Sequence, residues 1–405
     1  MKMSEDLMIF ENIGCDDHIG IYNAFLHAFS IVNKKVYEYL VQSSNAESLA
    51  SIYRDLSNEQ VETLLNYGVL INDEKIYLSK EHRHIYTERI RNIRTAYLHV
   101  TLDCNLSCSY CYNSQLTNKT YPQLGTEHWK LVIERLHEVG VINIVFTGGE
   151  PLLYPGLLDV IEFAKSLKLK VTLLTNGTLL RNNLDIFEMV DASIISLDGV
   201  SASRRKGIEQ HDVLNGILNI SEMYSKKITV RSVVSRGFES EVASLKALLE
   251  KNGIKHIQTL HIPYKPEDIK SIPDYDKFSL YDESFISPDF CGAGDGIVAI
   301  GVNGDIFPCQ TMIKPELCIA NIFEKDWLIK YRNDNVCAKI RIFKTSQNDL
   351  CRPCVAKHFC NGGCRAIAHN VYRDMTKPNE FLCDYYKKCA KVTIQKYFER
   401  ELIRG

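Results

Sequence analysis

The sequence predicts an α/β protein: a partial (β/α)6 barrel with a small α+β domain before it and a cysteine-rich domain after it. Between residues 95 and 265, apolar strand patterns alternate six times with amphipathic helix patterns, which is typical of a parallel sheet. Six units are too few to close an eight-stranded barrel, so we expect an open barrel with room for a large substrate. The flanking segments lack this alternation, and the last one contains clustered cysteines.

Length and composition are those of an ordinary globular protein. The 405 residues suggest two or three domains, and the net charge of −2 gives no general attraction to nucleic acid or anionic lipid. No apolar run approaches the ~20 residues of a membrane span, and the N-terminus shows no signal peptide. We therefore expect a cytoplasmic protein with no nucleic-acid or membrane partner. Its fourteen cysteines then indicate metal or catalytic sites, because cytosolic thiols stay reduced.

Residues 1–90 are predicted to form a winged-helix-like α+β domain. Residues 6–14 and 18–32 are expected as two strands joined by a turn at GCDDH. Helices are expected at 33–43, 45–56 and 58–67, the first two opening on asparagine caps and the third ending at Gly68. A two-stranded wing turning at Asn72 and Asp73 follows.

Six strand cores define the barrel over residues 95–265. They are expected at residues 96–102, 142–148, 170–177, 192–199, 228–234 and 256–263. Amphipathic segments such as 126–140 and 239–253 lie between them, and both end on a glycine, the usual helix stop. Polar residues at the carboxyl ends of such strands form the active sites of β/α barrels. The pair Asp198 and Gly199 reads as a turn.

The first barrel strand leads directly into Cys104, Cys108 and Cys111, spaced C-x3-C-x2-C. Three thiolates at this spacing can hold three irons of a 4Fe–4S cube and leave the fourth iron open. Zinc prefers four closed ligands, usually in C-x2-C pairs, so the alternative is a structural metal knuckle. About 40 residues later, TGGEP ends the second strand. Its two glycines permit a close approach of backbone to a ligand.

This combination of motifs resembles the radical S-adenosylmethionine (SAM) enzymes. The resemblance implies that the open iron binds the amino and carboxylate groups of SAM, and that one electron from the cluster cleaves SAM to a 5′-deoxyadenosyl radical. It places Tyr110 near the adenine, Gly148, Gly149 and Glu150 at the amino group, Asn176 and Ser196 at the ribose and carboxylate, and Arg231 at the carboxylate. Loop packing is the alternative for Tyr110, and turn or strand-end structure is the alternative for Asn176, Ser196 and Arg231.

A second cysteine region spans residues 285–390. Its pattern resembles, cysteine for cysteine, the SPASM domains, which hold two auxiliary 4Fe–4S clusters. The resemblance allots Cys351, Cys354, Cys360 and Cys383 to the outer cluster. It allots Cys291, Cys309 and Cys364 to the inner cluster. Zinc is the alternative for the C-x2-C pair.

The inner cluster departs from the family pattern. Members with a fully ligated inner cluster carry one more cysteine shortly before the first of the seven, but residues 281–290 contain none. We expect an open iron there, or a ligand such as Cys318 or a cysteine near the N-terminus. The other spare cysteines are expected to be small buried hydrophobic residues. An open iron would bind a substrate thiolate, which favours a thioether crosslink over a carbon–carbon one.

Residues 1–90 resemble the PqqD-like recognition element of enzymes that modify ribosomally made peptides, which binds the leader of a precursor peptide as an added strand. The resemblance as a whole is to a radical SAM/SPASM peptide maturase with three 4Fe–4S clusters, SAM, a precursor-peptide partner, and an electron donor such as flavodoxin or ferredoxin. A terminal helix is expected at 391–405. The alternatives are carbon–carbon crosslinking, formylglycine-type maturation of a protein, and an iron–sulfur DNA-binding sensor; residues 1–90 carry no clear basic patch for DNA.

Overall fold

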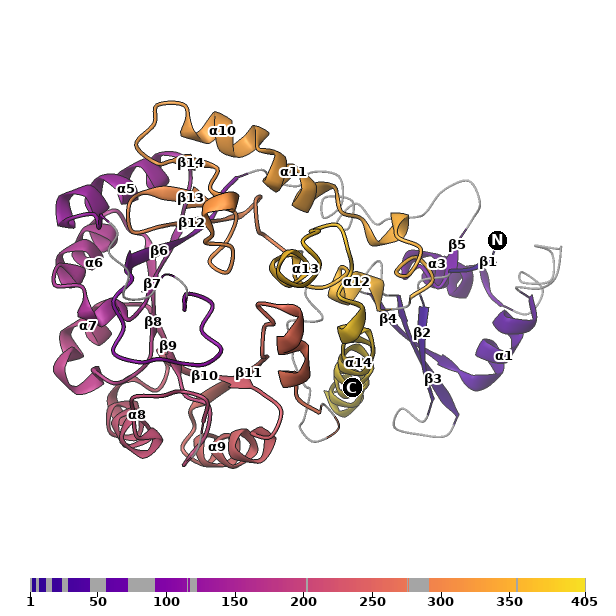
Figure 1. Cartoon of the computed structure of the whole chain (residues 1–405). Helices are drawn as coiled ribbons and strands as arrows, with labels where there is room; N and C mark the ends of the chain where they lie inside the picture. Colours follow the sequence, from indigo (N-terminus) through magenta and orange to yellow (C-terminus); the bar gives the residue numbers. More distant parts are fainter. Residues whose placement is uncertain are drawn as a thin grey trace.

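The computed structural model arranges the chain as three parts in a row (Figure 1). The barrel lies at one end, the cysteine-rich segment in the middle and the N-terminal sheet at the other end, next to the C-terminal helix. The structure describes residues 2–4, 7–11, 17–23, 28–43, 56–71, 92–114, 116, 122–201, 203–274, 276, 291–354 and 356–404.

Six parallel strands form the barrel in sequence order, which confirms the predicted alternation. They are β6 (Thr95–Thr101), β7 (Asn143–Gly148), β8 (Lys170–Thr175), β9 (Ala192–Ser196), β10 (Ile228–Val234) and β11 (Lys255–Leu260). Helices cover the outer face of this sheet (Figure 1). They are α5 (Thr126–Glu138), α6 (Leu157–Ser166), α7 (Leu184–Met189), α8 (Gln210–Tyr224) and α9 (Glu239–Lys251).

The barrel strands divide their side chains between two faces. In β6, Ala96, Leu98 and Val100 are buried in the core beneath the helices. Because successive side chains of a strand alternate, Tyr97 and His99 are left for the inner face. The inner, concave face is turned toward the cysteine-rich segment (Figure 1). A candidate site on that face would therefore lie between the barrel strands and the cysteine-rich segment.

The cysteine-rich segment extends the barrel sheet, which the sequence patterns did not predict. Strand β12 (Ile297–Ile300) pairs in parallel with β6, and β13 (Asp305–Phe307) and β14 (Ala320–Asn321) continue antiparallel to give nine strands. The sheet therefore crosses the predicted boundary at residue 285. Four helices follow: α10 (Trp327–Asn333), α11 (Asn335–Ile342), α12 (Lys357–Cys360) and α13 (Arg365–Tyr372). Short 3-10 turns span Pro151–Leu153, Leu180–Asn182, Pro266–Ser271, Pro315–Leu317, Thr345–Gln347 and Glu380–Leu382.

The N-terminal unit contains one strand more than predicted. Strands β2 (Leu7–Glu11), β3 (His18–Asn23) and β4 (Ala28–Asn33) form an antiparallel sheet, so the expected single strand 18–32 is wrong and forms two. Helices α1 (Lys34–Ser43) and α3 (Asn58–Asn66) follow, and β1 (Lys2–Met3) pairs with β5 (Leu70–Ile71). A capping box between Ser57 and Gln60 fixes the start of α3 near the predicted residue. The predicted helix 45–56 lies almost entirely, and the turn at 72–73 wholly, outside the described residues.

The N-terminal sheet is packed on both faces. One face contacts α1 and α3, through residues such as Ile21, Leu40 and Leu64. The other face contacts α14 (Cys383–Arg404), where Phe10 meets Phe398 with ring centroids 5.6 Å apart. The terminal helix predicted at 391–405 is thus the second part of a longer helix that begins at Cys383. No helix in the described part of the chain is long and apolar enough to cross a membrane.

Candidate active site

Cys104, Cys108 and Cys111 lie in the loop after β6, at the carboxyl end of the barrel strands. None of the three forms a disulfide within the described part of the chain, and all three are half-buried. Burial and the neighbouring thiols raise the pKa of Cys108 to about 11, although the positive charge of Arg205 acts to lower it. The three thiols therefore lie close enough to influence one another. Three convergent thiols at this position fit a 4Fe–4S cube with one open iron.

The ligands of a 4Fe–4S cube are spaced differently from those of a single metal ion. Among the described residues, no group of three or more His, Cys, Asp or Glu side chains is arranged to hold one metal ion. Each thiolate of a cube binds a different iron, so its ligands lie farther apart than those of one ion. The three thiols can therefore serve a cube without meeting the spacing of a single-ion site.

Gly148 and Gly149 let the end of β7 lie directly against the cysteine loop. A Cβ atom on Gly148, whose φ is +140°, would lie 2.2 Å from the Thr101 carbonyl oxygen. A Cβ atom on Gly149 would lie 2.2 Å from the Asp103 carbonyl oxygen. The Gly149 amide donates to the Thr101 carbonyl at 2.8 Å. The glycines thus permit an approach of backbone to backbone, a role that was not expected from the sequence.

The Glu150 carboxylate connects the ends of two strands. It is fully buried, and burial raises its pKa. Its Oε1 accepts hydrogen bonds from the Thr175 hydroxyl at 2.7 Å and from the Leu152 amide at 3.2 Å. Its Oε2 accepts one from the Asn176 amide at 2.7 Å. Three donors therefore engage the carboxylate within the protein.

Asn176 connects the end of β8 to the cysteine loop. Its Nδ2 donates to Asn105 Oδ1 at 2.8 Å and lies 3.9 Å from Cys104 Sγ. Its Oδ1 accepts from the Thr178 amide at 2.9 Å, which fixes the orientation of the side-chain amide. The structure thus brings Asn176 to the first cysteine.

Tyr110, Asp198 and Arg205 form a buried cluster beside the cysteines, and the sequence analysis missed two of its members. The Tyr110 hydroxyl donates to Asp198 Oδ2, and the Val233 amide donates to Asp198 Oδ1 at 2.9 Å. Asp198 is 2% exposed, so its interpretation as a simple turn residue is wrong. Arg205 donates to the carbonyl of Ser196 and, at 3.3 Å, to that of Asn176. The available sequence signal was the pair of adjacent arginines, Arg204 and Arg205. In the structure, their loop forms backbone hydrogen bonds with the cysteine loop.

Ser196 and Arg231 lie side by side on the inner face of the barrel, where their Cα atoms pair between β9 and β10. Arg231 also lies near Tyr97 and Tyr112, since its charge lowers the pKa of both phenols against the larger effect of their burial. Its Nε is buried and has no hydrogen-bond partner among the described residues. An anionic group of a ligand would supply that partner.

His261 follows β11 at the same end of the barrel. Its ring lies edge-on to that of Tyr110, with centroids 6.3 Å apart and an angle of 84°. The side chain is 2% exposed, and both ring nitrogens lack partners within the described part of the chain. Burial lowers the pKa of His261 to about 4, so the ring is neutral at pH 7. Together with Arg231, it gives this end of the barrel unsatisfied polar atoms that suit a polar ligand such as SAM.

The three cysteines expected to hold the inner auxiliary cluster lie close to one another. Burial, together with the nearby Cys364 and Cys291 thiols, raises the pKa of Cys309 to about 12, so these three thiols lie close together. Tyr264, just after β11, is within electrostatic reach of Cys111 on one side and of Cys364 and Cys309 on the other. Tyr264 is therefore close both to the loop after β6 and to the inner cysteines.

The spare cysteines differ in their surroundings. Cys318 is exposed, and its thiol faces the Ala320 carbonyl at 3.7 Å and the carboxylates of Asp305 and Glu324. Cys337 is fully buried against Gly294 and within electrostatic reach of Cys309, although its thiol contacts Asp334. Cys389 is buried in α14, and Cys15 lies outside the described residues.

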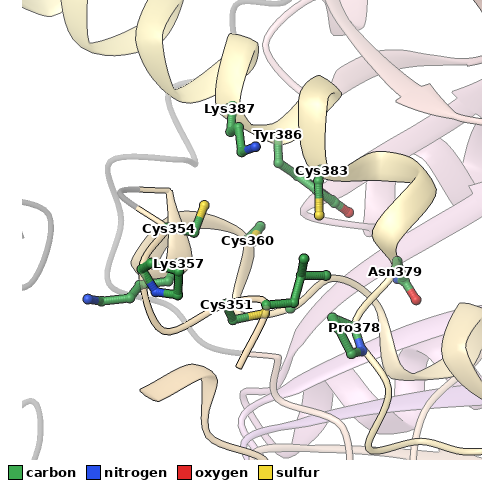
Figure 2. Close-up of a pocket in the computed structure, with 12 residues that line it drawn as sticks. Cys351, Cys354, Lys357, Cys360, Pro378, Asn379, Cys383, Tyr386 and Lys387 are labelled. Carbon is green, nitrogen blue, oxygen red and sulfur yellow. The ribbon is translucent and has the colours of Figure 1, made fainter. Parts of the chain in front are cut away.

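The outer auxiliary cysteines line a cavity of about 310 Å³. Figure 2 shows Cys383 extending from α14 toward the segment that carries Cys351, Cys354 and Cys360. Lys357 and Lys387 also line this cavity. A cavity bordered by four thiols fits a fully ligated 4Fe–4S cube.

Comparison with known proteins agrees with this site. Residues 98–273 match the Radical SAM superfamily. Over 311 residues, which are 66% of this chain and 84% of the relative, the chain is 24% identical to the PqqA peptide cyclase of Gluconobacter oxydans. Over 247 residues, 53% of this chain and 59% of the relative, it is 28% identical to the sporulation killing factor maturation protein SkfB of Bacillus subtilis.

A solved structure shares the fold over almost the whole chain. The crystal structure of Streptococcus suis SuiB bound to precursor peptide SuiA superposes with a TM-score of 0.57 and 16% identity. The match covers 94% of this chain and 99% of that one. The shared fold therefore extends beyond the barrel into the flanking parts.

Proposed function

We propose that this chain, whose residues 98–273 match the Radical SAM superfamily, is a radical SAM enzyme that modifies a ribosomally made precursor peptide. One observation carries the proposal: the buried Tyr264 phenol is close both to Cys111 of the loop after β6 and to Cys364 and Cys309, so the two groups of cysteines lie near each other. Two relatives named as a peptide cyclase and a maturation protein, and a similar fold crystallised with a precursor peptide, support the choice of substrate.

Cys104, Cys108 and Cys111 hold the catalytic cluster in this proposal, and Arg231 binds the SAM carboxylate through its unpartnered Nε. Tyr110 packs near the adenine, in a position that the Asp198 carboxylate fixes. Asn176 and Ser196 approach the ribose and carboxylate. Because three donors engage the Glu150 carboxylate, we assign recognition of the SAM amino group to the backbone carbonyls of the Gly148–Glu150 segment.

The proposed product is a thioether between a cysteine sulfur and a carbon of the peptide. When bound, the clusters and SAM supply the one-electron cleavage that generates a radical, and this radical removes a hydrogen atom from the substrate. The clusters also supply an acceptor for the electron that is released when the new bond forms. Joining S–H and C–H to form S–C releases two hydrogens: one ends in 5′-deoxyadenosine, and the other leaves as a proton and an electron. With Cys291, Cys309 and Cys364 as its only proposed protein ligands, the inner cluster would have one iron open to the peptide thiolate. A carbon–carbon crosslink is the second candidate if that position has a protein ligand.

The N-terminal unit is proposed to bind the leader of the peptide. Among the described strands of its sheet, β2 and β4 each pair only with β3, so each has one open edge. An extended peptide can pair with such an edge through main-chain hydrogen bonds. In β4, Ile31 is 40% exposed and offers an apolar contact beside the edge. A ferredoxin or flavodoxin as electron donor, and a cytoplasmic location, complete the proposal.

The test is iron content together with SAM cleavage. Anaerobically reconstituted protein should contain about twelve irons per chain. Changing Cys104, Cys108 and Cys111 together to Ala should remove about four of these and abolish reductive SAM cleavage. Cys318→Ala, at an exposed cysteine outside the three proposed clusters, is the matched control and should retain both. SAM cleavage that survives the triple change would refute the assignment of the catalytic cluster.

A further inference from the structure

Arg365 is a buried charged side chain close to cysteines of both proposed auxiliary sites. It follows Cys364 directly and begins helix α13. Only 2% of the residue is exposed, and it is among the largest fully buried side chains of the protein. Its guanidinium lies 4.0 Å from the ring centroid of Phe343.

Every N–H group of this guanidinium donates a hydrogen bond to a backbone carbonyl. Nε donates to the Gly363 carbonyl at 3.2 Å. Nη1 donates to the carbonyls of Met375 at 2.8 Å and Lys377 at 3.2 Å. Nη2 donates to the carbonyls of Gly362 and Gly363. A guanidinium has five N–H groups, so none remains for a cluster sulfur or a thiolate.

The ionisable groups that act most strongly on Arg365 are thiols and one phenol. They are Cys364 and Cys291 of the inner site, Cys351 of the outer site, and Tyr386. Within the described residues Arg365 makes no ion pair with a carboxylate. Arg205, the corresponding buried arginine beside Cys108, faces the Asp198 carboxylate instead. The charge of Arg365 is therefore buried without a carboxylate to balance it.

Burying an unbalanced charge is strongly unfavourable, because carbonyl dipoles replace only part of its hydration. The thiolates of two iron–sulfur clusters would supply negative charge on both sides of the guanidinium. The charge near a cluster is one of the factors that set its reduction potential. Reduction adds a negative charge, so a fixed positive charge nearby favours the reduced form.

We infer that Arg365 is a shared electrostatic residue of the two auxiliary clusters, whose fixed positive charge raises the reduction potentials of both. The inference rests on the auxiliary clusters of the proposed function. Since all its N–H groups are engaged by carbonyls, Arg365 acts through its charge and not through a hydrogen bond to sulfur. Its place beside Cys364 and Cys291 makes the effect larger at the inner cluster, the proposed electron acceptor.

The experiment is a redox titration followed by electron paramagnetic resonance. The full chain with Cys104, Cys108 and Cys111 changed to Ala retains only the auxiliary clusters, so their signals are free of the catalytic one. In this background, Arg365→Gln removes the charge and Arg365→Lys keeps it. Arg135→Gln is the matched control, because Arg135 in α5 also donates to backbone carbonyls, those of Ile322 and Glu324 after β14.

We expect Arg365→Gln to shift the auxiliary midpoint potentials to more negative values, most strongly at the inner cluster. Arg365→Lys should stay near the parent, and Arg135→Gln should not differ from it. If Arg365→Gln loses auxiliary iron, Arg365→Lys should keep more of it. Unchanged potentials in Arg365→Gln, or a lysine variant no better than the glutamine variant in both potential and iron content, would overturn the inference. A parent that holds no auxiliary iron would instead refute the proposed clusters.

Discussion

The Tyr110 hydroxyl donates a hydrogen bond to the buried carboxylate of Asp198, which joins the cysteine loop to the end of strand β9. The same carboxylate faces Arg205, whose guanidinium lies beside Cys108. One buried anion thus positions the aromatic ring proposed to face adenine and balances a cation near the catalytic cysteines. This relationship leads to the first prediction.

Asp198→Asn should weaken SAM binding while the iron content stays close to that of the parent. The change keeps an acceptor for the Val233 amide but removes the charge that balances Arg205. Hydrogen bonds to charged groups contribute about 1.5–3 kcal/mol, which corresponds to a Kd roughly ten to a hundred times higher. Equilibrium dialysis with SAM measures the effect. Tyr110→Phe loses only the hydrogen bond and should have a smaller effect; equal SAM affinity in all three proteins would contradict the role of Asp198.

Gly149→Ala should displace the cysteine loop. The added methyl would lie 2.2 Å from the Asp103 carbonyl oxygen and 2.8 Å from that of Leu102, and neither backbone group can move aside easily. Overpacking of this kind costs about 1–3 kcal/mol, so we expect a lower unfolding midpoint and loss of iron from the catalytic site. Gly125→Ala is the control, because a Cβ atom there meets nothing within 4 Å. Full iron content in Gly149→Ala would show that the close approach is dispensable.

The barrel was predictable from the sequence because each of its strands is a local pattern. The strand predicted at 228–234 has the same bounds in the structure. Strand β12 was not predictable in this way, since its four residues are too short to form a pattern and pair with β6, about 200 residues earlier in the chain. The cysteines were found by their spacing. Asp198 and Arg205 were missed because their roles depend on contacts between separate loops.

The inner site gives a prediction about Cys337. If an iron of that cluster is open, Cys337→Ala should retain all auxiliary iron, because its thiol contacts Asp334 and does not serve as a ligand. Cys309→Ala should lose iron from the inner cluster, and Cys318→Ala should not. Iron analysis together with electron paramagnetic resonance distinguishes the variants. Loss of the inner signal in Cys337→Ala would identify a fourth protein ligand and shift the proposed product to a carbon–carbon crosslink.

Buried histidines predict acid sensitivity of the fold. Burial lowers the pKa of His99 to about 3, and those of His256 and His261 to about 4. Below pH 6.5 the unfolded chain binds protons at these sites that the folded chain does not bind. The free energy of unfolding should therefore fall as pH drops from 6.5 toward 4, by up to about 1.4 kcal/mol per pH unit for each histidine.

Urea denaturation at several pH values under anaerobic conditions measures this slope. His99→Gln should make the slope shallower by up to one proton than in the parent. Cluster loss in acid affects both proteins alike, so the comparison between them isolates the histidine. A slope in His99→Gln equal to that of the parent would refute the assignment.

The packing of Phe398 predicts that helix α14 holds the N-terminal unit in place. Its ring is 1% exposed and contacts those of Phe10 and Phe29, with centroids 5.6 Å and 5.3 Å away. Phe398→Ala removes a buried ring, which typically costs 3–5 kcal/mol, and we expect proteolysis to release the N-terminal unit first. SAM cleavage without peptide should persist while peptide modification falls. Ile329→Ala, at a side chain that is 64% exposed, should change neither; equal protease resistance in both variants would contradict this docking.

The terminal helix shows why such docking could not be predicted. Its apolar residues indicated a helix with a buried side, and α14 has that side in Ala390, Ile394 and Phe398. The sequence did not indicate that the partner is the sheet of β2, β3 and β4, because the choice between apolar faces depends on the shape of both.

The mass of a precursor peptide after reaction tests the central claim most directly. A cysteine-containing peptide encoded beside this gene, incubated with the reduced holoenzyme and SAM, should lose two hydrogen atoms for each crosslink. The product should resist thiol alkylation at the linked cysteine, and a peptide with Ser in place of that cysteine should keep its mass. SAM cleavage that proceeds normally while the mass of the cysteine-containing peptide stays unchanged would contradict a peptide-modifying function.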